Sequence, residues 1–401
     1  MQCLVLLIAL FILLIHASAS SCTSRLGIGL ESAAIFDVLT YGAVGDGKAD
    51  DTQAFLKAWA DACKASEAQG IPTLKMPSGK TFFLKPADFR GPCKSKGITV
   101  QLEGTIIAPQ NSGDWTRKDR WIVFSGIDGL ILTGGGQIDG QGSVWWKACS
   151  VKALYFDKCN GLQLSKLRHL NSPRNHIGLN DCDGVQISDL QILAPADSPN
   201  TDGIDIASSC NIEIMDSVMQ TGDDCIAINN GTSHINITGV ACGPGHGISV
   251  GSLGKNGAYD TVEEVHVRNC TFTGTQNGAR IKTWKGGSGY ARKISFEQIV
   301  LIGPQNPIII DQNYDPHGVI NAGSLQNAVE VSDVTFRDVR GTSATELAIA
   351  INCSGGTGCT NVVLEQVDIK SAVPGKMTYA SCNNAHGEAK ACNPVVPCVA
   401  H

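Results

Sequence analysis

Aromatic and charged residues are scarce in this chain, and no long hydrophobic run follows its first 20 residues. Aromatic residues make up 6% of the 401 residues and charged residues 17%, whereas 43% are hydrophobic. A chain of this length and hydrophobic content can bury a large core. The formal net charge is −6, so the basic excess typical of nucleic-acid binding is missing and nucleic acid is not an expected partner.

The N-terminal region lacks Lys and Arg but otherwise resembles a secretory signal. Leu4–Ile15 is an uncharged apolar run, and Ala17-Ser18-Ala19 matches a small-residue cleavage site. The run is too short to span a bilayer well, which argues against a membrane anchor. We therefore expect residues 1–20 to be a signal peptide and residues 21–401 to be an extracellular domain with no membrane contact.

Secretion permits disulfides. The chain has 16 cysteines, and loss of Cys3 with the signal leaves an odd number, so at least one thiol stays unpaired or pairs between chains. Expected disulfides within the chain are Cys63–Cys93, Cys225–Cys242, Cys353–Cys359 and a C-terminal tail tied through Cys382, Cys392 or Cys398. Four sequons also suit secretion, at Asn230, Asn236, Asn269 and Asn352.

A short apolar motif recurs along the chain. Apolar residues stand at positions x, x+2 and x+5 in copies that start at Leu162, Val185, Ile235, Val265, Ile294, Val334 and Val362. The copy at Ile212 is imperfect because Ser217 takes the third place. Alternation over x and x+2 indicates a strand, and the break before x+5 indicates a corner followed by a second strand.

One turn of chain per repeat, with no helix between the strands, is a parallel β-helix whose coils stack at about 4.8 Å. An antiparallel sandwich with accidental spacing is the alternative, and seven copies in one register disfavour it. The 45 glycines lack a collagen period and indicate many turns. We therefore predict one solenoid, although the length alone suggests two or three domains.

A helix is predicted after Asp50 or Asp51, with Gln53 near its first turn as in a capping box. Its apolar stripe has helical spacing and consists of Ala54, Phe55, Ala58, Trp59, Ala62 and Cys63. Because a solenoid needs its open hydrophobic end covered, this helix is the candidate cap.

Charged residues gather between 198 and 282. Asp202, Asp224 and His246 are spaced 22 residues apart, so they stack in a chain that coils at this period. Arg280 and Lys282 are two positions apart and face the same side of a strand. Asp223 and Asp224 are adjacent, so both can serve one site only if Gly222-Asp223-Asp224 lies at a bend.

Carboxylates this close raise at least one carboxyl pKa, which lets an acid and a base coexist. A protonated carboxyl group beside an ionised one provides the acid and the base of glycoside hydrolysis. An arginine can bind the carboxylate of an anionic sugar through two parallel hydrogen bonds. Each motif alone is more often a turn or a solvated strand face. A calcium site is a further alternative for three aspartates.

Several stretches together carry a family resemblance. They are Asn200-Thr-Asp-Gly203, Gly222-Asp-Asp-Cys225, Gly245-His-Gly247, Arg280-Ile-Lys282, Ile310-Asp-Gln-Asn-Tyr314, Gly136–Trp146 and Phe36-Asp-Val38. In this order and spacing they resemble the polygalacturonases, the inverting pectin hydrolases of glycoside hydrolase family 28. The resemblance covers nearly the whole mature chain and is closest to plant, pollen-type enzymes, many of which attack the chain end.

The resemblance implies an all-β fold, a single right-handed parallel β-helix of the pectin-lyase type. It implies Asp223 as the general acid, Asp202 and Asp224 as the carboxylates that hold and activate water, and His246 as a group that shares the acid's proton. Arg280 and Lys282 would bind the galacturonate carboxylate, and Tyr314 would shape the site. It implies no metal and no other cofactor.

The implied activity is secreted, exo-acting hydrolysis of α-1,4-galacturonosidic bonds in pectin by a monomer in the plant cell wall. Alternatives are an endo-acting polygalacturonase, a calcium-dependent pectate lyase and an inactive wall-binding protein. One departure from the family stands after Tyr314, where Asp315 and then Pro316 replace the usual cysteine. That removes an expected loop disulfide.

Overall fold

The computed structural model describes residues 34–68, 70–115, 117–146, 151–315, 327–356 and 358–399. These residues belong to one compact unit, Ala33–His401. The predicted signal peptide, residues 1–20, lies outside the described residues, as do Cys22 and Cys149.

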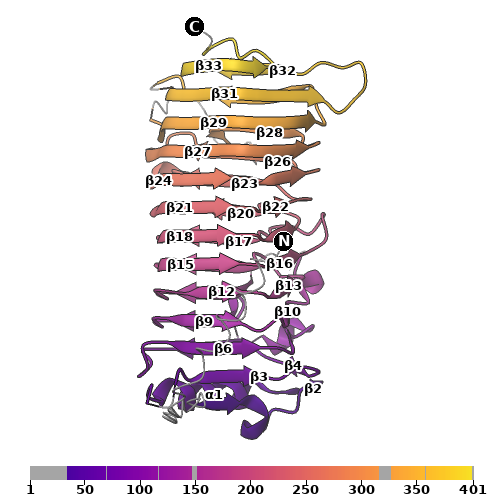
Figure 1. Cartoon of the computed structure of the whole chain (residues 1–401), viewed down its shortest axis with the longest axis vertical. Helices are drawn as coiled ribbons and strands as arrows, with labels where there is room; N and C mark the ends of the chain where they lie inside the picture. The colour runs from indigo at the N-terminus through magenta and orange to yellow at the C-terminus, as the bar shows by residue number, and fades with distance from the viewer. Residues whose placement is uncertain are drawn as a thin grey trace, which may run out of the picture. The chain divides into compact units, whose positions relative to one another are not determined.

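The described strands form three parallel stacks, each running along the solenoid in chain order (Figure 1). The first stack is β1 (Ile35–Asp37), β3 (Thr73–Met76), β6 (Ile98–Leu102), β9 (Leu130–Thr133), β12 (Gln163–Ser165), β15 (Asp183–Ser188), β18 (Cys210–Met215), β21 (Thr232–Thr238), β24 (Tyr259–Arg268), β27 (Ser288–Ile302), β29 (Glu330–Ser343), β31 (Cys359–Ser371) and β33 (Ala385–Asn393). The second is β2 (Asp46–Asp50), β4 (Thr81–Phe83), β7 (Thr105–Ile107), β10 (Gln137–Asp139), β13 (Arg168–Leu170), β16 (Gln191–Leu193), β19 (Val218–Gln220), β22 (Ala241–Cys242) and β25 (Thr271–Thr273), and it joins the end of β27.

The third stack is a sheet of its own. It consists of β5 (Ala87–Arg90), β8 (Arg120–Ser125), β11 (Lys152–Asp157), β14 (Ile177–Asn180), β17 (Ile204–Ala207), β20 (Ile226–Ile228), β23 (Ile248–Leu253), β26 (Asn277–Trp284), β28 (Asn306–Tyr314), β30 (Leu347–Asn352) and β32 (Tyr379–Asn383). Short 3-10 turns lie at η1 (Val38–Tyr41), η2 (Ser112–Asp114), η3 (Gly142–Val144) and η4 (Lys255–Gly257). The predicted parallel β-helix is confirmed.

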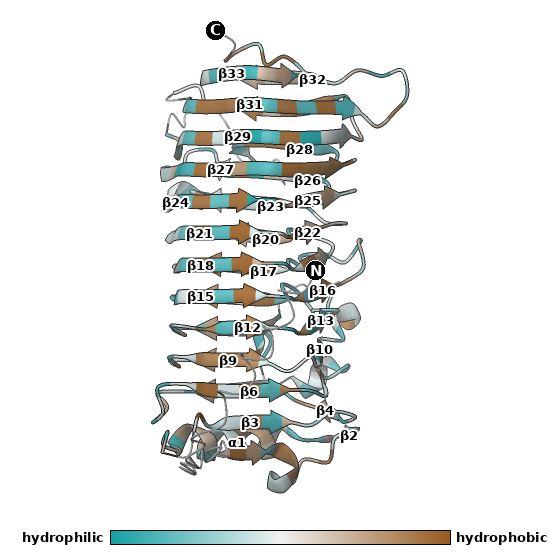
Figure 2. Cartoon of the chain, in the orientation of Figure 1, coloured by the Kyte–Doolittle hydropathy of each residue, from teal (hydrophilic) through white to brown (hydrophobic). Residues whose placement is uncertain are grey.

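The apolar residues of the predicted repeat form the core row, the line of buried side chains inside the first stack. Val185 pairs with Ile212, Ile212 with Ile235, and Ile235 with Val265, and all of them are fully buried. Hydrophobic and hydrophilic positions alternate along these strands, as Figure 2 shows for β15, β18 and β21. Because side chains alternate between the two faces of a strand, this pattern sends one face of every coil into the interior.

The predicted corner before x+5 is made by a left-handed residue. Asp189, Asp216 and Asn269 stand at x+4 of their copies and have φ of 55°, 46° and 52°. Asn and Asp enter this region more readily than other non-glycine residues. The left-handed residue breaks the strand, and the chain turns into the second stack.

Ser217 lies in the core row, and its hydroxyl is hydrogen-bonded. Its hydroxyl accepts a hydrogen bond from the Leu190 amide at 3.1 Å and donates one to the Met215 carbonyl at 2.8 Å. A buried hydroxyl is tolerated when it is hydrogen-bonded. The imperfect copy is therefore accommodated.

Helix α1 (Thr52–Lys64) covers the first coil, as predicted, and packs against β1, β3 and β5. Its buried face holds Phe55 and Trp59, whose rings contact Phe82 and Phe89 edge-on. The predicted capping box is wrong. The Asp51 carboxylate accepts the amides of Val44 and Gly45 and makes no hydrogen bond to the helix amides.

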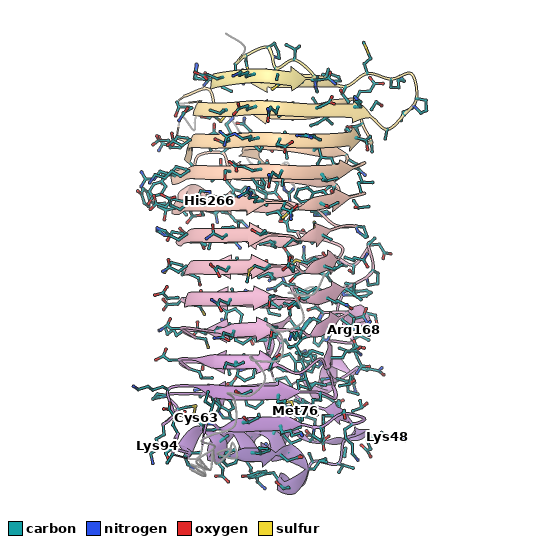
Figure 3. The ribbon with its side chains drawn as sticks, in the orientation of Figure 1. Lys48, Cys63, Met76, Lys94, Arg168 and His266 are labelled. Carbon is teal, nitrogen blue, oxygen red and sulfur yellow. A yellow bond between two sulfur atoms is a disulfide. The ribbon has the colours of Figure 1, made fainter. Side chains whose placement is uncertain are left out.

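Four disulfides are present among the described residues: Cys63–Cys93, Cys225–Cys242, Cys353–Cys359 and Cys382–Cys398. The first joins α1 to the segment after β5, at the end of the solenoid where Figure 3 marks Cys63. The three predicted loop disulfides and the tied tail are confirmed, and Cys392 remains a thiol. The buried thiols of Cys159, Cys182 and Cys270 are also unpaired.

The four sequon asparagines are all exposed. Within the described residues, no helix is long and apolar enough to cross a membrane.

The core row should dominate stability. Ile214 is fully buried and Glu213, its neighbour in β18, is exposed. We expect Ile214→Ala to lower the free energy of unfolding by about 2–5 kcal/mol, since it leaves a cavity between stacked coils. Glu213→Ala should change it by less than about 0.5 kcal/mol. Urea unfolding of both variants measures the difference, and equal losses would contradict the assigned core row.

Candidate active site

The charged residues lie where the second stack passes into the third. Asp202 precedes β17, Asp224 precedes β20 and His246 precedes β23, each by two residues. The Gly203 amide donates to the Asp224 carbonyl at 2.9 Å, and the His246 amide to the Asp223 carbonyl at 2.8 Å. Residues 22 positions apart therefore stand side by side on successive coils, as the sequence predicted.

The predicted bend at Gly222-Asp223-Asp224 is confirmed. A side chain at Gly222 could not fit, because a Cβ there would lie 2.0 Å from the Ser198 carbonyl oxygen. The Gly222 amide donates to the Thr201 hydroxyl at 2.9 Å. The loop that carries Asp202 therefore packs closely against the bend. Because of the bend, the side chains of Asp223 and Asp224 can both reach one site.

Asp223 is held by His246 and Asn200. His246 Nδ1 lies 2.9 Å from Asp223 Oδ1, and Asn200 Nδ2 donates to Asp223 Oδ2 at 3.2 Å. The side chains of Asp223 and His246 are 17% and 32% exposed. This pair is therefore open enough for a ligand to reach.

Asp224 is buried and bound by two cations. Its Oδ1 accepts Arg280 Nη2 and the Ser249 hydroxyl, and its Oδ2 accepts Lys282 Nζ at 2.8 Å. Arg280 Nε also donates to the Ser249 hydroxyl at 2.8 Å. Arg280 and Lys282 do face the same side of β26, as predicted, and each is 8% exposed.

Tyr314 closes one edge of this group. Lys282 Nζ lies 5.5 Å from the centroid of the Tyr314 ring, within the range of a cation–π contact. The Trp284 ring meets Tyr314 edge-on at 5.2 Å, and Lys255 Nζ lies 5.2 Å from the Trp284 ring. The loop that follows Asp315 lies outside the described residues.

The family model described as Glycosyl hydrolases family 28 matches residues 63–393. The chain belongs to glycosyl hydrolase family 28. It is 49% identical over 374 residues to the "probable polygalacturonase" of Arabidopsis thaliana, covering 92% of this chain and 81% of that protein. It is 42% identical over 356 residues to a polygalacturonase of Malus domestica, covering 86% and 75%. The resemblance inferred from the motifs is confirmed.

A solved family 28 neighbour supports the fold. Endo-xylogalacturonan hydrolase from Aspergillus tubingensis superposes with a TM-score of 0.77 at 23% identity, covering 88% of this chain and 96% of that one. At this identity the likeness concerns the fold alone.

Two carboxyl groups of this cluster have pKa values that are shifted in opposite directions. Burial raises the pKa of Asp202 well above its usual range, and the charges of Asp205, Asp223 and Asp224 add to the rise. Burial also acts to raise the pKa of Asp223, but the His246 hydrogen bond and charge outweigh it and lower that pKa to about 2. Asp202 therefore favours its protonated form, whereas Asp223 favours its ionised form.

The site offers one set of possible metal ligands among the described residues. Oxygens of Asp223 and Asp224 and a nitrogen of His246 lie within 4.8 Å of one another. Both Asp224 oxygens, however, already accept hydrogen bonds from Arg280 and Lys282. Two fixed cations repel a divalent ion, so the arrangement suits an anion and proton transfer better than a metal.

Sequence reasoning missed three residues of this site. Asn200 orients Asp223, Ser249 bridges Asp224 and Arg280, and Asp205 contributes a buried carboxyl whose Oδ1 has no hydrogen-bond partner. Asn200 stands inside the motif that contains Asp202, so its position carried a signal. Ser249 and Asp205 lie on strands and carried none.

The raised pKa of Asp202 should limit stability. At a pH between its unfolded value of about 3.9 and its higher folded value, the unfolded chain releases a proton that the folded chain keeps. The folded state therefore loses stability as pH rises through this window. Asp202→Asn cannot ionise, so we expect its melting temperature to exceed that of the wild type at pH 7 and to match it near pH 3.

Thermal unfolding of both proteins across this range measures the effect. Asp128→Asn, at an exposed aspartate, is the matched control and should follow the wild type at every pH. A melting difference for Asp202→Asn that does not vary with pH would contradict the proposed cause.

Proposed function

We propose that this family 28 chain hydrolyses α-1,4-galacturonosidic bonds in polygalacturonate. The observation that carries the proposal is the open Asp223–His246 pair beside Asp224, a carboxylate bound to Arg280 and Lys282. Carboxyl groups in different protonation states provide the acid and the base of glycoside hydrolysis. Relatives that cover most of the chain are named polygalacturonases.

Asp223 is assigned as the general acid, and its proton comes from His246. The two groups lie 2.9 Å apart, and the hydrogen bond and charge of His246 lower the pKa of Asp223. A bound sugar excludes water, and a drier environment favours the neutral pair, in which the proton has moved from His246 to Asp223. Asp223 then protonates the oxygen of the leaving sugar.

Asp202 and Asp224 are assigned to the attacking water. A higher pKa makes a carboxylate a stronger base, so Asp202 is the better proton acceptor once it is ionised. Asp224 is fixed by Ser249, Arg280 and Lys282 and orients the water. Direct attack by water inverts the anomeric centre.

Arg280, Lys282 and Tyr314 are assigned to the galacturonate unit. The two cations retain N–H donors beyond those bound to Asp224, and a sugar carboxylate would share them. The Tyr314 ring beside Lys282 offers an apolar wall for a sugar face. A neutral sugar would not need two cations at this point, so their presence favours an anionic sugar.

The finer assignments rest on the resemblance to plant enzymes. They are attack from the chain end, secretion to the cell wall after removal of residues 1–20, and a monomeric state. Loops at 253–259 and 285–290 flank Trp284 and decide whether a long chain can pass through. Sizing of early products from a long oligogalacturonide separates the modes, since single released units indicate end attack and mixed lengths indicate internal attack.

Asp223→Asn should remove proton donation and leave the fold intact. General acid catalysis contributes about 10²–10⁴-fold, so we expect kcat to fall by at least that range. Reducing-sugar release from polygalacturonate measures the loss, with Asp128→Asn as the control. Near-normal turnover by a folded Asp223→Asn protein would reject Asp223 as the acid.

The rate should follow a bell-shaped curve in mildly acid solution. As pH rises through the raised pKa of Asp202, this base loses its proton and the rate increases. At higher pH the general acid is no longer supplied with a proton, and the rate falls. The limbs report macroscopic values of the coupled group. His246→Ala should lower kcat and displace the alkaline limb more than the acid limb.

Activity should survive a chelator, because the acids handle protons and water. Hydrolysis yields saturated products, whereas a calcium-dependent lyase yields an unsaturated sugar. Treatment with EDTA and ultraviolet detection of unsaturated ends test both points. Loss of activity that calcium restores, together with unsaturated products, would favour the lyase, and absence of any turnover would favour a wall-binding protein.

A further inference from the structure

The sequon at Asn236 lies on the outer wall of the first stack. Asn236 and Thr238 stand two positions apart in β21 and are both exposed, so they share the outward face of the strand. Strand pairing places Glu213 of β18 beside Asn236 on one side and His266 of β24 on the other. The sequon is therefore in the middle of a sheet face, a wall that Figure 3 marks at His266.

A groove of about 410 Å³ lies over this sequon. Its volume is within the range of about 300–1,000 Å³ found for small-molecule sites. Two rows of side chains from β18, β21, β24 and β27 line it, the first being Glu213, Asn236, His266 and Ser295 and the second Met215, Thr238, Arg268 and Glu297. The sequon residues are shorter than Glu213, Met215 and Arg268 beside them, so the hollow is centred on the sequon.

The groove offers a sugar both hydrogen-bonding groups and an apolar contact. His266 Nδ1 lies 3.0 Å from the Ser295 hydroxyl, and Arg268 Nε donates to Gln298 Oε1 at 2.8 Å. The guanidinium of Arg268 has further N–H donors, and Met215 is 36% exposed. Ligand sites combine apolar surface of this kind with a few placed polar groups.

The fold does not use the Asn236 carboxamide. Among the described residues it has no hydrogen-bond partner. Asn230, the sequon asparagine nearest in sequence, differs because its Oδ1 accepts the Thr261 amide at 2.9 Å. A substituent on Asn236 Nδ2 would therefore break no contact, and it would start directly in the groove.

The groove and the acids lie on different walls of the solenoid. β21 begins the coil that continues through β22 to His246 and β23. The acids stand where the second stack passes into the third, whereas the groove is on the outward face of the first stack. A group attached to Asn236 therefore projects away from the acids.

We propose that Asn236 carries an N-linked glycan whose first sugar lies in this groove. The inference rests on the secretion proposed above, because such glycans are added to secreted chains as bulky, solubilising surface groups. On transfer, Asn236 Nδ2 forms a bond to C1 of a sugar donated by an oligosaccharide linked to a lipid diphosphate. The C1–O bond to the diphosphate breaks, the diphosphate leaves with the electron pair, and the amide nitrogen gives up one proton.

Occupancy is tested on the full chain, with residues 1–20, secreted from plant cells. Mass spectrometry of the peptide that contains Asn236, before and after a peptide N-glycosidase, should show a glycan on this residue. Asn236→Gln and Thr238→Ala should each remove it, and Thr238→Ser, which keeps the sequon, should retain it. An unmodified Asn236 in the secreted protein would overturn the proposal, and a chain that is not secreted would overturn it together with the predicted signal peptide.

The place of the sugar is tested by the rate at which the N-glycosidase releases the glycan from the folded protein. Met215→Ala/Arg268→Ala keeps the sequon and opens the groove, so release should be faster by about threefold or more, the equivalent of one lost hydrogen bond. Lys370→Ala, at an exposed position of β31, is the control and should match the wild type. The single variant Arg268→Ala serves if the double variant folds poorly. Equal release from the wild type and the groove variant would overturn the seating of the sugar.

Turnover separates this inference from the proposed activity. Because the groove and the acids are distant and share no contacts, Thr238→Ala should keep kcat/KM on polygalacturonate within about twofold of the wild type. A tenfold loss in the folded variant would contradict the placement of the glycan away from the acids. A glycosylated wild type that is inactive on polygalacturonate would support the glycan and overturn the proposed hydrolysis.

Discussion

The register between stacked coils is the constraint on which the site depends. Asp224 and Lys282 are 58 positions apart in the chain and meet at 2.8 Å because every coil between them pairs in register with the next. A slip of one residue would turn the core row of Val185, Ile212 and Ile235 outward. The core that stabilises the solenoid therefore also sets the geometry of the acids.

That geometry holds like charges together against their repulsion. Asp224 is compensated by Arg280 and Lys282, and Asp223 by His246. Asp202 has no comparable cation partner, and its pKa rises accordingly. Breaking a buried ion pair leaves one charge uncompensated, so the compensated acids tolerate little change. The uncompensated carboxyl of Asp202 therefore holds a proton more readily than Asp223 does.

Much of the fold could be read from the sequence, because its determinants are local and repeated. A strand, a corner and a second strand are predicted by the spacing of Val185, Ile187 and Leu190, and the structure repeats this unit. The capping box at Gln53 failed because Asp51 binds Val44 and Gly45, a loop contact that no local pattern encodes. In the site, the motifs located Asp202, Asp223, Asp224 and His246. The pairing of Asp224 with Arg280 depends on the lengths of the coils between them, so it needed the structure.

A polyanionic substrate sharpens the role of the cations. The chain carries a net charge of −6, and four of its carboxyl groups lie in the site, so long-range attraction cannot bring an acidic polymer to it. Local cations must supply that attraction, since charges farther than about 8–10 Å apart are screened at physiological salt. Arg280 and Lys282, the two cations that bind Asp224, supply it beside the acids. An acidic sugar therefore has to share these two cations with Asp224.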